Sequence, residues 1–223
     1  MIIVHHLENS RSHRVLWLLE ELGVEYGIKP YERDRATMRA PPSLREVHPL
    51  GKSPIITDGS LTLAESGAII EYLVEKHPAA AMAPARDTPQ YVRYIYWLHY
   101  AEGSAMPPLL LKLIFDRIEH APMPLFAKPI ARSIARRIKR QFVEPELCAH
   151  LDFLETELGK SRWFAGDAFT AADIQMSYPI EAANARAALD ASRPHLMAFI
   201  GRIRDRPAYR RAVERAGGHM VLK

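Results

Sequence analysis

The chain has 223 residues, 48% of them apolar and 25% charged, which is enough to bury one large hydrophobic core or two modest ones. Its formal net charge of +4 falls short of the basic excess typical of a dedicated nucleic-acid-binding protein, so we expect no nucleic acid partner. Small anionic molecules remain compatible with this charge.

Cysteine content and hydropathy indicate in which cellular compartment the protein is expected. Cys148 is the only cysteine, which excludes an internal disulfide and favours a reducing compartment, so we expect the chain to be cytoplasmic. No window reaches the roughly 18 uninterrupted apolar residues of a membrane-spanning helix, and the apolar stretch at the start is too short for a signal peptide. We therefore expect no integral membrane association.

The start of the chain alternates strand and helix patterns. The β-branched segment 2–6 indicates a buried strand, and the spacing of apolar residues in 11–23 indicates a helix that ends at a glycine. Segment 24–33 has a second strand pattern, in which Pro30 suits an edge strand or a strand end. The predicted order is β-α-β.

A hairpin and a helix follow this unit. Residues 34–47 have a mixed pattern without a long helix. Two short apolar segments on either side of Asp58-Gly59 predict a β-hairpin, and helical apolar spacing from Ser66 to residue 77 predicts a helix. The order βαβ-ββα predicts a small α+β domain.

The rest of the chain has no convincing strand pattern. We predict a first domain at 1–78, an Ala/Pro-rich linker at 79–88 and an all-α helical bundle domain at 89–223. Thr170 and Asp173 have the spacing of a capping box, which predicts a helix start. Long helical patterns occur at 89–118, 129–158, 171–189 and 194–216.

The segment HPLGKSP and the helix start that follows predict a binding site. Pro54 can head a strand because its missing N–H lies where the ladder begins, and a cis Ser53-Pro54 bond would leave the main chain of Ser53 free to pair with an extended peptide. Glu65 and Ser66 combine a carboxylate with free helix N–H groups, which suits an α-amino acid. The sequence therefore predicts a site for a small peptide.

These motifs resemble the cytosolic glutathione S-transferase family, in a microbial branch with a serine-type loop. HPLGKSPIITDG with LTLAESGAIIEYL resembles its glutathione-binding core, and FTAADI resembles the capping motif of its helical domain. The resemblance covers essentially the whole chain. It implies a thioredoxin-like first domain, glutathione as co-substrate and a homodimer.

The resemblance also implies roles for individual residues. It implies that Ser53 pairs with the cysteinyl backbone of glutathione and that Pro54 is cis. It implies that Glu65 and Ser66 hold the γ-glutamyl end. Lys52 would lie near a carboxylate of the ligand.

The catalytic residue is expected just after the first strand, where the family uses Tyr, Ser or Cys to activate the glutathione thiol. Residues 1–25 contain no Tyr or Cys. Aligning Arg14 with the arginine of the serine-type loop nominates Ser10, with Asn9 and Ser12 as the alternatives. Ser10 could instead only cap the following helix.

The predicted reaction is attack of the glutathione thiolate on a small hydrophobic electrophile held by the helical domain. Tyr94, Trp97, Tyr100 and Met106 offer an apolar second site, or else belong to the core or a dimer interface. Cys148 is expected to be a small core residue. We expect no metal, because the histidines lack metal-ligand spacing.

Two other functions fit the same fold. One is glutathione-dependent reduction of a peroxide or a disulfide, and the other is a non-catalytic, glutathione-binding regulator. Sequence alone does not separate these activities from a transferase.

Segment 128–142 contains six lysines and arginines, opposed by Ile130, Ile134, Ile138 and Phe142. Such a helix can bind a membrane surface or nucleic acid. We favour a bundle helix whose apolar stripe faces the core.

Overall fold

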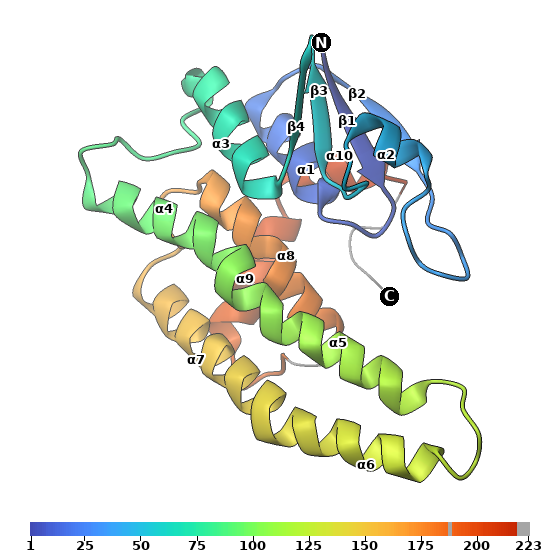
Figure 1. The fold of residues 1–223 in the computed structure, drawn as a ribbon. Helices are drawn as coiled ribbons and strands as arrows, with labels where there is room; N and C mark the ends of the chain where they lie inside the picture. Colours follow the sequence, from blue (N-terminus) through green and yellow to red (C-terminus); the bar gives the residue numbers. More distant parts are fainter. Residues whose placement is uncertain (187–188, 218–223) are drawn as a thin grey trace.

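The computed structural model describes residues 1–186 and 189–217, and it has a mixed sheet with flanking helices at one end and a helical bundle at the other (Figure 1). The predicted fold class, a thioredoxin-like α+β domain followed by a helical domain, is confirmed. The first part contains β1 (Ile2–Leu7), α1 (Ser12–Leu22), β2 (Tyr26–Tyr31), α2 (Ser43–Val47), β3 (Ile55–Asp58), β4 (Leu61–Ala64) and α3 (Ser66–Lys76).

The sheet has the strand order β2-β1-β3-β4. Strand β1 pairs in parallel with β2 and antiparallel with β3, and β3 pairs with β4 as the predicted hairpin. Pro30 lies in the edge strand β2, as expected, because an edge position does not need its missing N–H. Helix α2 was not predicted, since five residues are too few to show a helical period.

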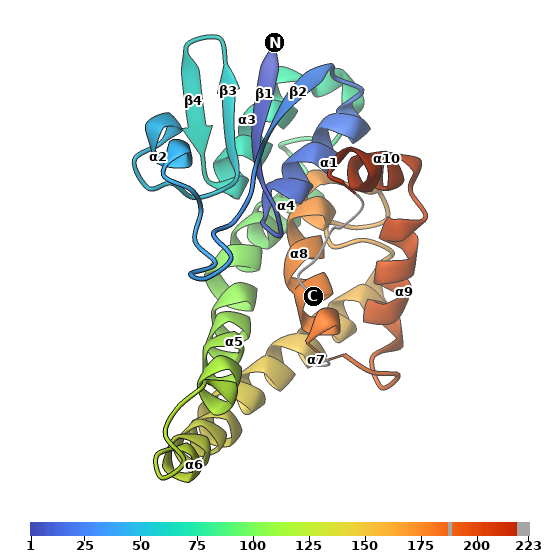
Figure 2. The ribbon, with the colours of Figure 1, turned by 90° about the vertical axis from the view of Figure 1, so that its right-hand side faces the viewer.

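Alternate side chains of the strands enter two separate apolar clusters. Val4 and Ile56 lie in the main core under α1 and α3, whereas Leu7 and Ile55 pack with Leu44 of α2 on the opposite face. Figure 2 shows α1 and α2 on opposite sides of the sheet. The sheet is therefore covered on both faces, which leaves the ends of its strands for a site.

The second part consists of helices only, within the residues described. Two of its long helices each contain a π-helical turn that ends two residues before a proline, at Pro107-Pro108 and at Pro145. Proline lacks the N–H of a regular helix, and a wide turn accommodates this. The elements are α4 (Pro89–Tyr100), π turn η2 (Ala101–Ala105), α5 (Met106–His120), α6 (Lys128–Ile138), π turn η3 (Lys139–Val143), α7 (Glu144–Lys160), α8 (Ala171–Ala185), α9 (Pro194–Arg204) and α10 (Pro207–Arg215).

The two parts share one continuous core. Helix α1 packs against α8 and α10, and the main apolar cluster runs from the sheet into the helical part. Between them lie the 3-10 turn η1 (Pro78–Ala80) and the buried Met82, whose carbonyl accepts a hydrogen bond from the Ala171 N–H. The division into 1–78, 79–88 and 89–223 stays a prediction.

Several predicted details were wrong. The segment 194–216 forms two helices, because Pro207 starts a new one after a break. Cys148 is exposed, since the buried face of α7 carries its leucines instead. The predicted helix 171–189 ends at Ala185, and its residues 187–188 lie outside the described part.

The stripe on segment 128–142 does not face the core as we had favoured. Ile130, Ile134 and Phe142 are 62%, 56% and 69% exposed. Helix α6 packs on α5 through Ala135, which lies on a different side of the helix. The stripe is therefore an exposed apolar surface.

The predicted capping box of α8 is present and extends further than the motif requires. Thr170 and Asp173 form the reciprocal cap, and the Asp173 carboxylate also accepts a hydrogen bond from the main-chain N–H of Phe164 at 2.8 Å. Asp173 is fully buried. One side chain therefore fixes both the start of α8 and the loop before it.

Replacing Asp173 with alanine should lower the unfolding free energy by roughly 2–5 kcal/mol, because the N–H groups of Phe164 and Thr170 lose their acceptor while buried. Urea unfolding followed by circular dichroism measures this. The matched control is Asp167→Ala, at an exposed aspartate in the same loop. Equal stability of the two variants would contradict the assigned role.

Candidate functional site

A cavity of about 220 Å³ lies where the loop before β3 meets the start of α3. It brings together all five of the predicted binding residues: Lys52, Ser53, Pro54, Glu65 and Ser66. Sequence reasoning did not identify its other lining residues, which are Arg11, His48, Leu50, Ala64 and Glu102. Ser10 is not among the residues that line it.

The loop before β3 has the geometry expected of a peptide-binding edge. The Ser53-Pro54 peptide bond is cis. Among the described residues, no main-chain hydrogen bond involves the N–H or the C=O of Ser53. The Ser53 side chain is fixed instead: its hydroxyl donates to the His5 carbonyl at 3.2 Å and accepts from the Leu7 N–H at 3.4 Å. The main chain of Ser53 is thus available for an extended ligand.

The start of α3 forms the other wall of the cavity. Glu65 precedes the helix with a φ of +72°, a backbone conformation that side chains rarely adopt. Ser66 is buried, while Glu65 is exposed. This wall therefore presents a carboxylate beside the positive end of a helix, as binding of an ammonium and a carboxylate requires.

Ser10 takes part in a chain of hydrogen bonds that ends at Ser53. The His6 imidazole contacts the Ser12 hydroxyl at 2.8 Å, Ser12 contacts the Ser10 hydroxyl at 2.8 Å, and Ser10 donates to the Ser53 hydroxyl at 3.1 Å. Ser10 also accepts the Ser12 main-chain N–H at 3.3 Å. Burial lowers the pKa of His6, although Glu8 opposes this effect. The chain therefore joins a neutral imidazole to the cavity wall.

Two arginines of α1 and its preceding loop meet one carboxylate in the cavity. Arg14 is fully buried; it donates to the Ser66 hydroxyl at 3.0 Å, to the Gln175 carbonyl at 2.8 Å and to the Glu102 carboxylate. The Arg11 Nε lies 3.0 Å from the same carboxylate. Because Glu102 stands in the π turn η2, these contacts connect the helical part with the start of α3.

These charges shift the pKa of Glu102. Burial alone would raise it, but Arg14 and Arg11 outweigh burial and the pKa is lowered. Glu102 therefore stays ionised at neutral pH and compensates the buried charge of Arg14.

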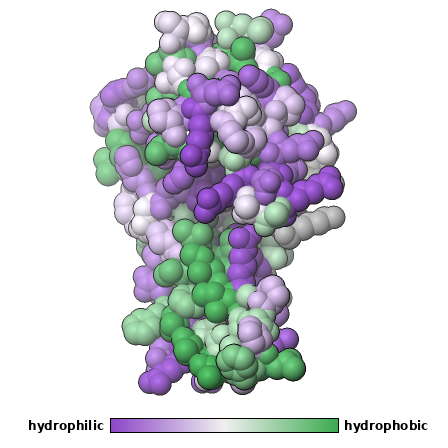
Figure 3. Space-filling view, turned by 45° about the vertical axis from the view of Figure 1, so that its right-hand side comes forward, coloured by the Kyte–Doolittle hydropathy of each residue, from purple (hydrophilic) through white to green (hydrophobic). Residues whose placement is uncertain are grey.

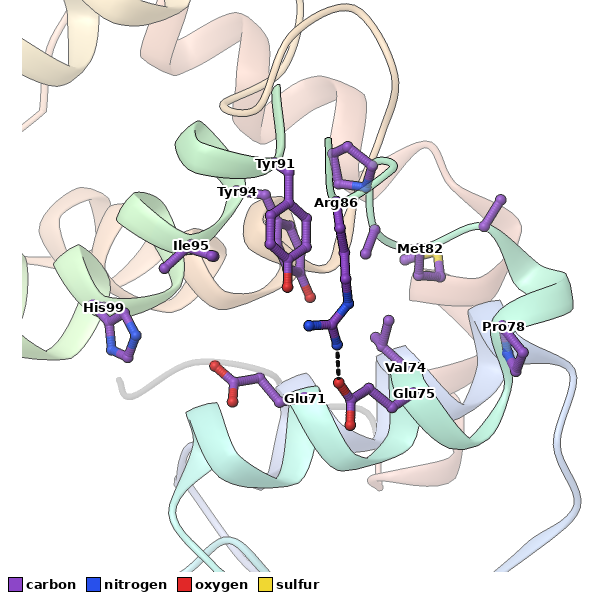
Figure 4. A pocket seen from close by; sticks show the side chains of 13 residues that line it. Glu71, Val74, Glu75, Pro78, Met82, Arg86, Tyr91, Tyr94, Ile95 and His99 are labelled. Carbon is purple, nitrogen blue, oxygen red and sulfur yellow. Dashed lines mark hydrogen bonds and ion pairs between the residues drawn. The ribbon is translucent and has the colours of Figure 1, made fainter. Parts of the chain in front are cut away.

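The aromatic run on α4 belongs to the core rather than to this cavity. Tyr94, Trp97, Tyr100 and Met106 are all buried, and none lines the site. A separate cavity of about 430 Å³ lies between α3 and α4, where Glu71, Arg86 and Tyr91 project into it (Figure 4). Tyr94 lines that cavity, away from Ser53.

Within the described ranges 1–186 and 189–217, no group of three or more His, Cys, Asp or Glu side chains is arranged to hold a metal ion. No helix in those ranges is long and apolar enough to cross a membrane.

Comparison with known proteins gives the family. Residues 1–75 match the model of the glutathione S-transferase N-terminal domain, and residues 123–207 match that of the C-terminal domain. The chain is 39% identical over 215 residues to "Glutathione S-transferase 3" of Schizosaccharomyces pombe, which covers 96% of this chain and 88% of that protein. It therefore belongs to the glutathione S-transferase family.

Further relatives agree with this. "Glutathione S-transferase 1" of Saccharomyces cerevisiae is 37% identical over 190 residues, covering 82% of this chain and 81% of that protein. The crystal structure of a glutathione S-transferase from Actinobacillus pleuropneumoniae aligns with a TM-score of 0.78 at 31% identity, covering 98% of this chain and 94% of that one. A sphingomonad glutathione S-transferase complexed with glutathione aligns with a TM-score of 0.72 at 25% identity, covering 96% and 98%.

Replacing Glu102 with glutamine should lower the unfolding free energy at pH 7 by about 1–3 kcal/mol, because the buried Arg14 loses its compensating charge. The folded-state pKa of Glu102 is lowered, so its contribution is present above the ordinary pKa near 4.5 and is lost as the pH falls through the folded-state value. The difference between the two proteins should therefore shrink in acid.

Urea unfolding at neutral and at acidic pH measures this effect. The control is Glu75→Gln, whose partner Arg86 forms an exposed ion pair and whose loss should matter by less than about 1 kcal/mol at any pH. A difference between wild type and Glu102→Gln that is independent of pH would contradict the assigned ion pair.

Proposed function

We propose that the protein is a glutathione S-transferase that binds glutathione in the cavity between Ser53 and Glu65 and activates its thiol for attack on a small electrophile. The observation that carries this proposal is the convergence of Lys52, Ser53, Pro54, Glu65 and Ser66 on one cavity. Family membership and the glutathione complex of the sphingomonad relative support it.

Each wall of the cavity would hold one part of glutathione. The unpaired main chain of Ser53 would pair with the cysteinyl residue as a short added strand. The helix start at Ser66 would hold the γ-glutamyl carboxylate, and the Glu65 side chain would accept from its ammonium. Lys52, which is exposed at the rim, would lie near the other carboxylate.

The thiol would lie near the loop that follows β1. Ser10 is our proposed catalytic residue, because its hydroxyl is one hydrogen bond from Ser53 and could turn from it to the thiolate. Lowering a thiol pKa from about 8.5 to about 6.5 takes roughly 2.7 kcal/mol, which one charge-assisted hydrogen bond and a helix N-terminus can supply. Asn9 and Ser12 stay alternatives, and the cavity adds Arg11 as a further candidate.

The reaction would form a thioether bond: the thiolate sulfur attacks an electrophilic carbon and the leaving group departs with the electron pair. The second substrate would be small and hydrophobic. Glutathione-dependent peroxide or disulfide reduction and a non-catalytic regulator are the alternative functions. The co-substrate would be reduced glutathione, and the reaction would need no metal. The protein would be cytoplasmic, because its single cysteine cannot form an internal disulfide.

Ultraviolet thiolate absorbance of bound glutathione, titrated from about pH 5 to about pH 9, tests this mechanism. We expect a thiol pKa near about 6.5 in the wild type, returning towards about 8.5 in Ser10→Ala, with Ser60→Ala in the exposed β3–β4 turn as the unchanged control.

Two other outcomes of this titration would contradict the proposed mechanism. A lowered thiol pKa that survives in Ser10→Ala would reject Ser10 and move the role to Asn9, Ser12 or Arg11. Glutathione binding with an ordinary thiol pKa would reject the transferase in favour of the regulator.

We also propose that the protein forms a homodimer. Besides the resemblance, α4 exposes Val92, Ile95 and Tyr96, which are 69%, 37% and 47% accessible in the single chain. Light scattering should give twice the mass of one chain, and Val92→Asp should shift this towards the monomer while Glu144→Gln, exposed on α7, should not. A monomeric wild type at micromolar concentration would reject the dimer.

A further inference from the structure

Two buried histidines lie behind the wall of the glutathione cavity, and the proposed reaction uses neither of them. His6 lies on β1 and His13 on α1, and their rings meet edge to face with centroids 5.2 Å apart. On the face drawn in Figure 3, the sheet end of the molecule shows mainly hydrophilic side chains, but these two rings lie beneath the surface and are only 6% and 3% exposed. Burying a polar group is unfavourable unless it forms a hydrogen bond, so the partners of the two rings indicate what they do.

The two histidines differ in their partners. The His6 Nδ1 lies 2.8 Å from the Ser12 hydroxyl, whereas neither ring nitrogen of His13 has a hydrogen-bond partner among the described residues. Burial lowers the pKa of His13 to about 3, and it also lowers the pKa of His6 against the opposing effect of Glu8. Both rings are therefore neutral at pH 7, so only one of the two nitrogens of His6 carries a proton.

The hydrogen bonds along the serines determine which nitrogen of His6 carries that proton. A serine hydroxyl has one proton to donate. The Ser53 hydroxyl donates to the His5 carbonyl, so in its contact with Ser10 it is the acceptor. Ser12 must then donate to Ser10, because Ser10 has no second proton. The proton of Ser12 is thereby used, and the His6 Nδ1 must be the donor to Ser12.

This direction leaves Ser10 able to donate only. Its oxygen accepts from the Ser12 hydroxyl at 2.8 Å and from the Ser12 main-chain N–H at 3.3 Å, so both of its lone pairs are occupied. A hydrogen-bond donor favours a thiolate over a thiol, because the anion is the stronger acceptor. The proton of Ser10 can also turn to a sulfur without leaving Ser53 unpaired, since Ser53 keeps its hydrogen bonds to Leu7 and His5.

We propose that His6 is a positioning residue: by donating from Nδ1 to Ser12, it directs the proton of Ser10 at the sulfur of glutathione. In the other tautomer, Nδ1 would accept the proton of Ser12, and Ser10 could then donate to Ser12 instead of to the sulfur. Hydrogen bonds that run in one direction also strengthen one another, by roughly 10–30% per bond. His6 acts through Ser10, so this role rests on the proposed function of Ser10.

The thiolate titration of bound glutathione tests this role with two variants of His6. His6→Phe keeps a ring of similar size and removes the donor, so we expect the thiol pKa to rise by about 0.5–1 above the wild-type value. His6→Asn places an amide N–H close to the position of Nδ1 and should return the thiol pKa to within about 0.3 of the wild type. A residue that only fills space would give the opposite order, because phenylalanine preserves the packing better than asparagine does.

The matched control is His13→Phe, which replaces the neighbouring buried imidazole that has no hydrogen-bond partner within the described residues. Its thiol pKa should stay within about 0.3 of the wild type. Neither histidine lines the cavity, so the dissociation constant of glutathione should change by less than about twofold in all three variants. Circular dichroism verifies that each variant is folded.

A second measurement does not depend on glutathione. Nitrogen-15 NMR of the wild-type protein with labelled histidine should show a proton on Nδ1 of His6 at about pH 7 and none on its Nε2. Because this measurement uses the wild type, it tests the proposal even where a variant fails to fold.

Four results would overturn the role of His6. They are a His6 Nδ1 without a proton, an unchanged thiol pKa in His6→Phe, a rise in His6→Phe that His6→Asn does not reverse, and an equal rise in His13→Phe. Where Ser10→Ala still raises the thiol pKa, these results reject His6 alone and leave the transferase proposal standing. An ordinary thiol pKa in the wild type, or a lowered one that survives in Ser10→Ala, would instead reject the function of Ser10 and the role of His6 with it.

Discussion

The arrangement of the site depends on the buried guanidinium of Arg14. It reaches the start of α3 through Ser66, the main chain of α8 through Gln175 and the π turn through Glu102. A guanidinium suits this position because its planar fork can donate in several fixed directions at once. Removing such a charge from water is unfavourable unless it is paired. Because the partners of Arg14 lie in both parts of the protein, these contacts hold the sheet and the helical part in one relative position.

The π turn η2 explains how a helix side chain reaches this cation. Proline at 107 and 108 cannot continue the regular hydrogen-bond ladder of α4, and the wide turn before them takes up the irregularity. Glu102 lies within that turn and is directed to Arg11 and Arg14. A break in a long helix thereby becomes part of the cavity wall.

The features that could be predicted from sequence are those encoded locally. The β3–β4 hairpin and the capping box at Thr170 each follow from neighbouring residues with a definite backbone preference, whereas the cis bond at Pro54 was expected from the family resemblance. The partners of Arg14 could not be predicted in this way, because Glu102 and Gln175 are remote in sequence and no local pattern links them.

The prediction that the apolar stripe on α6 faces the core was wrong for a related reason. A hydrophobic period states that a helix has an apolar side, and it does not state that a neighbour covers that side. Ile130 and Ile134 have no covering element among the described residues. Likewise, Ser10 was singled out by its place in the loop, whereas its hydrogen bond to Ser53 depends on the tertiary fold.

Glu65 has an unfavourable backbone conformation at the wall of the cavity. With a φ of +72°, this residue occupies a conformation that only glycine adopts without penalty, and an ordinary side chain there costs on the order of 1–3 kcal/mol. A sequence selected for stability alone would carry glycine at this position. The glutamate therefore marks a point where local stability has been exchanged for a carboxylate held at a fixed place on the cavity wall.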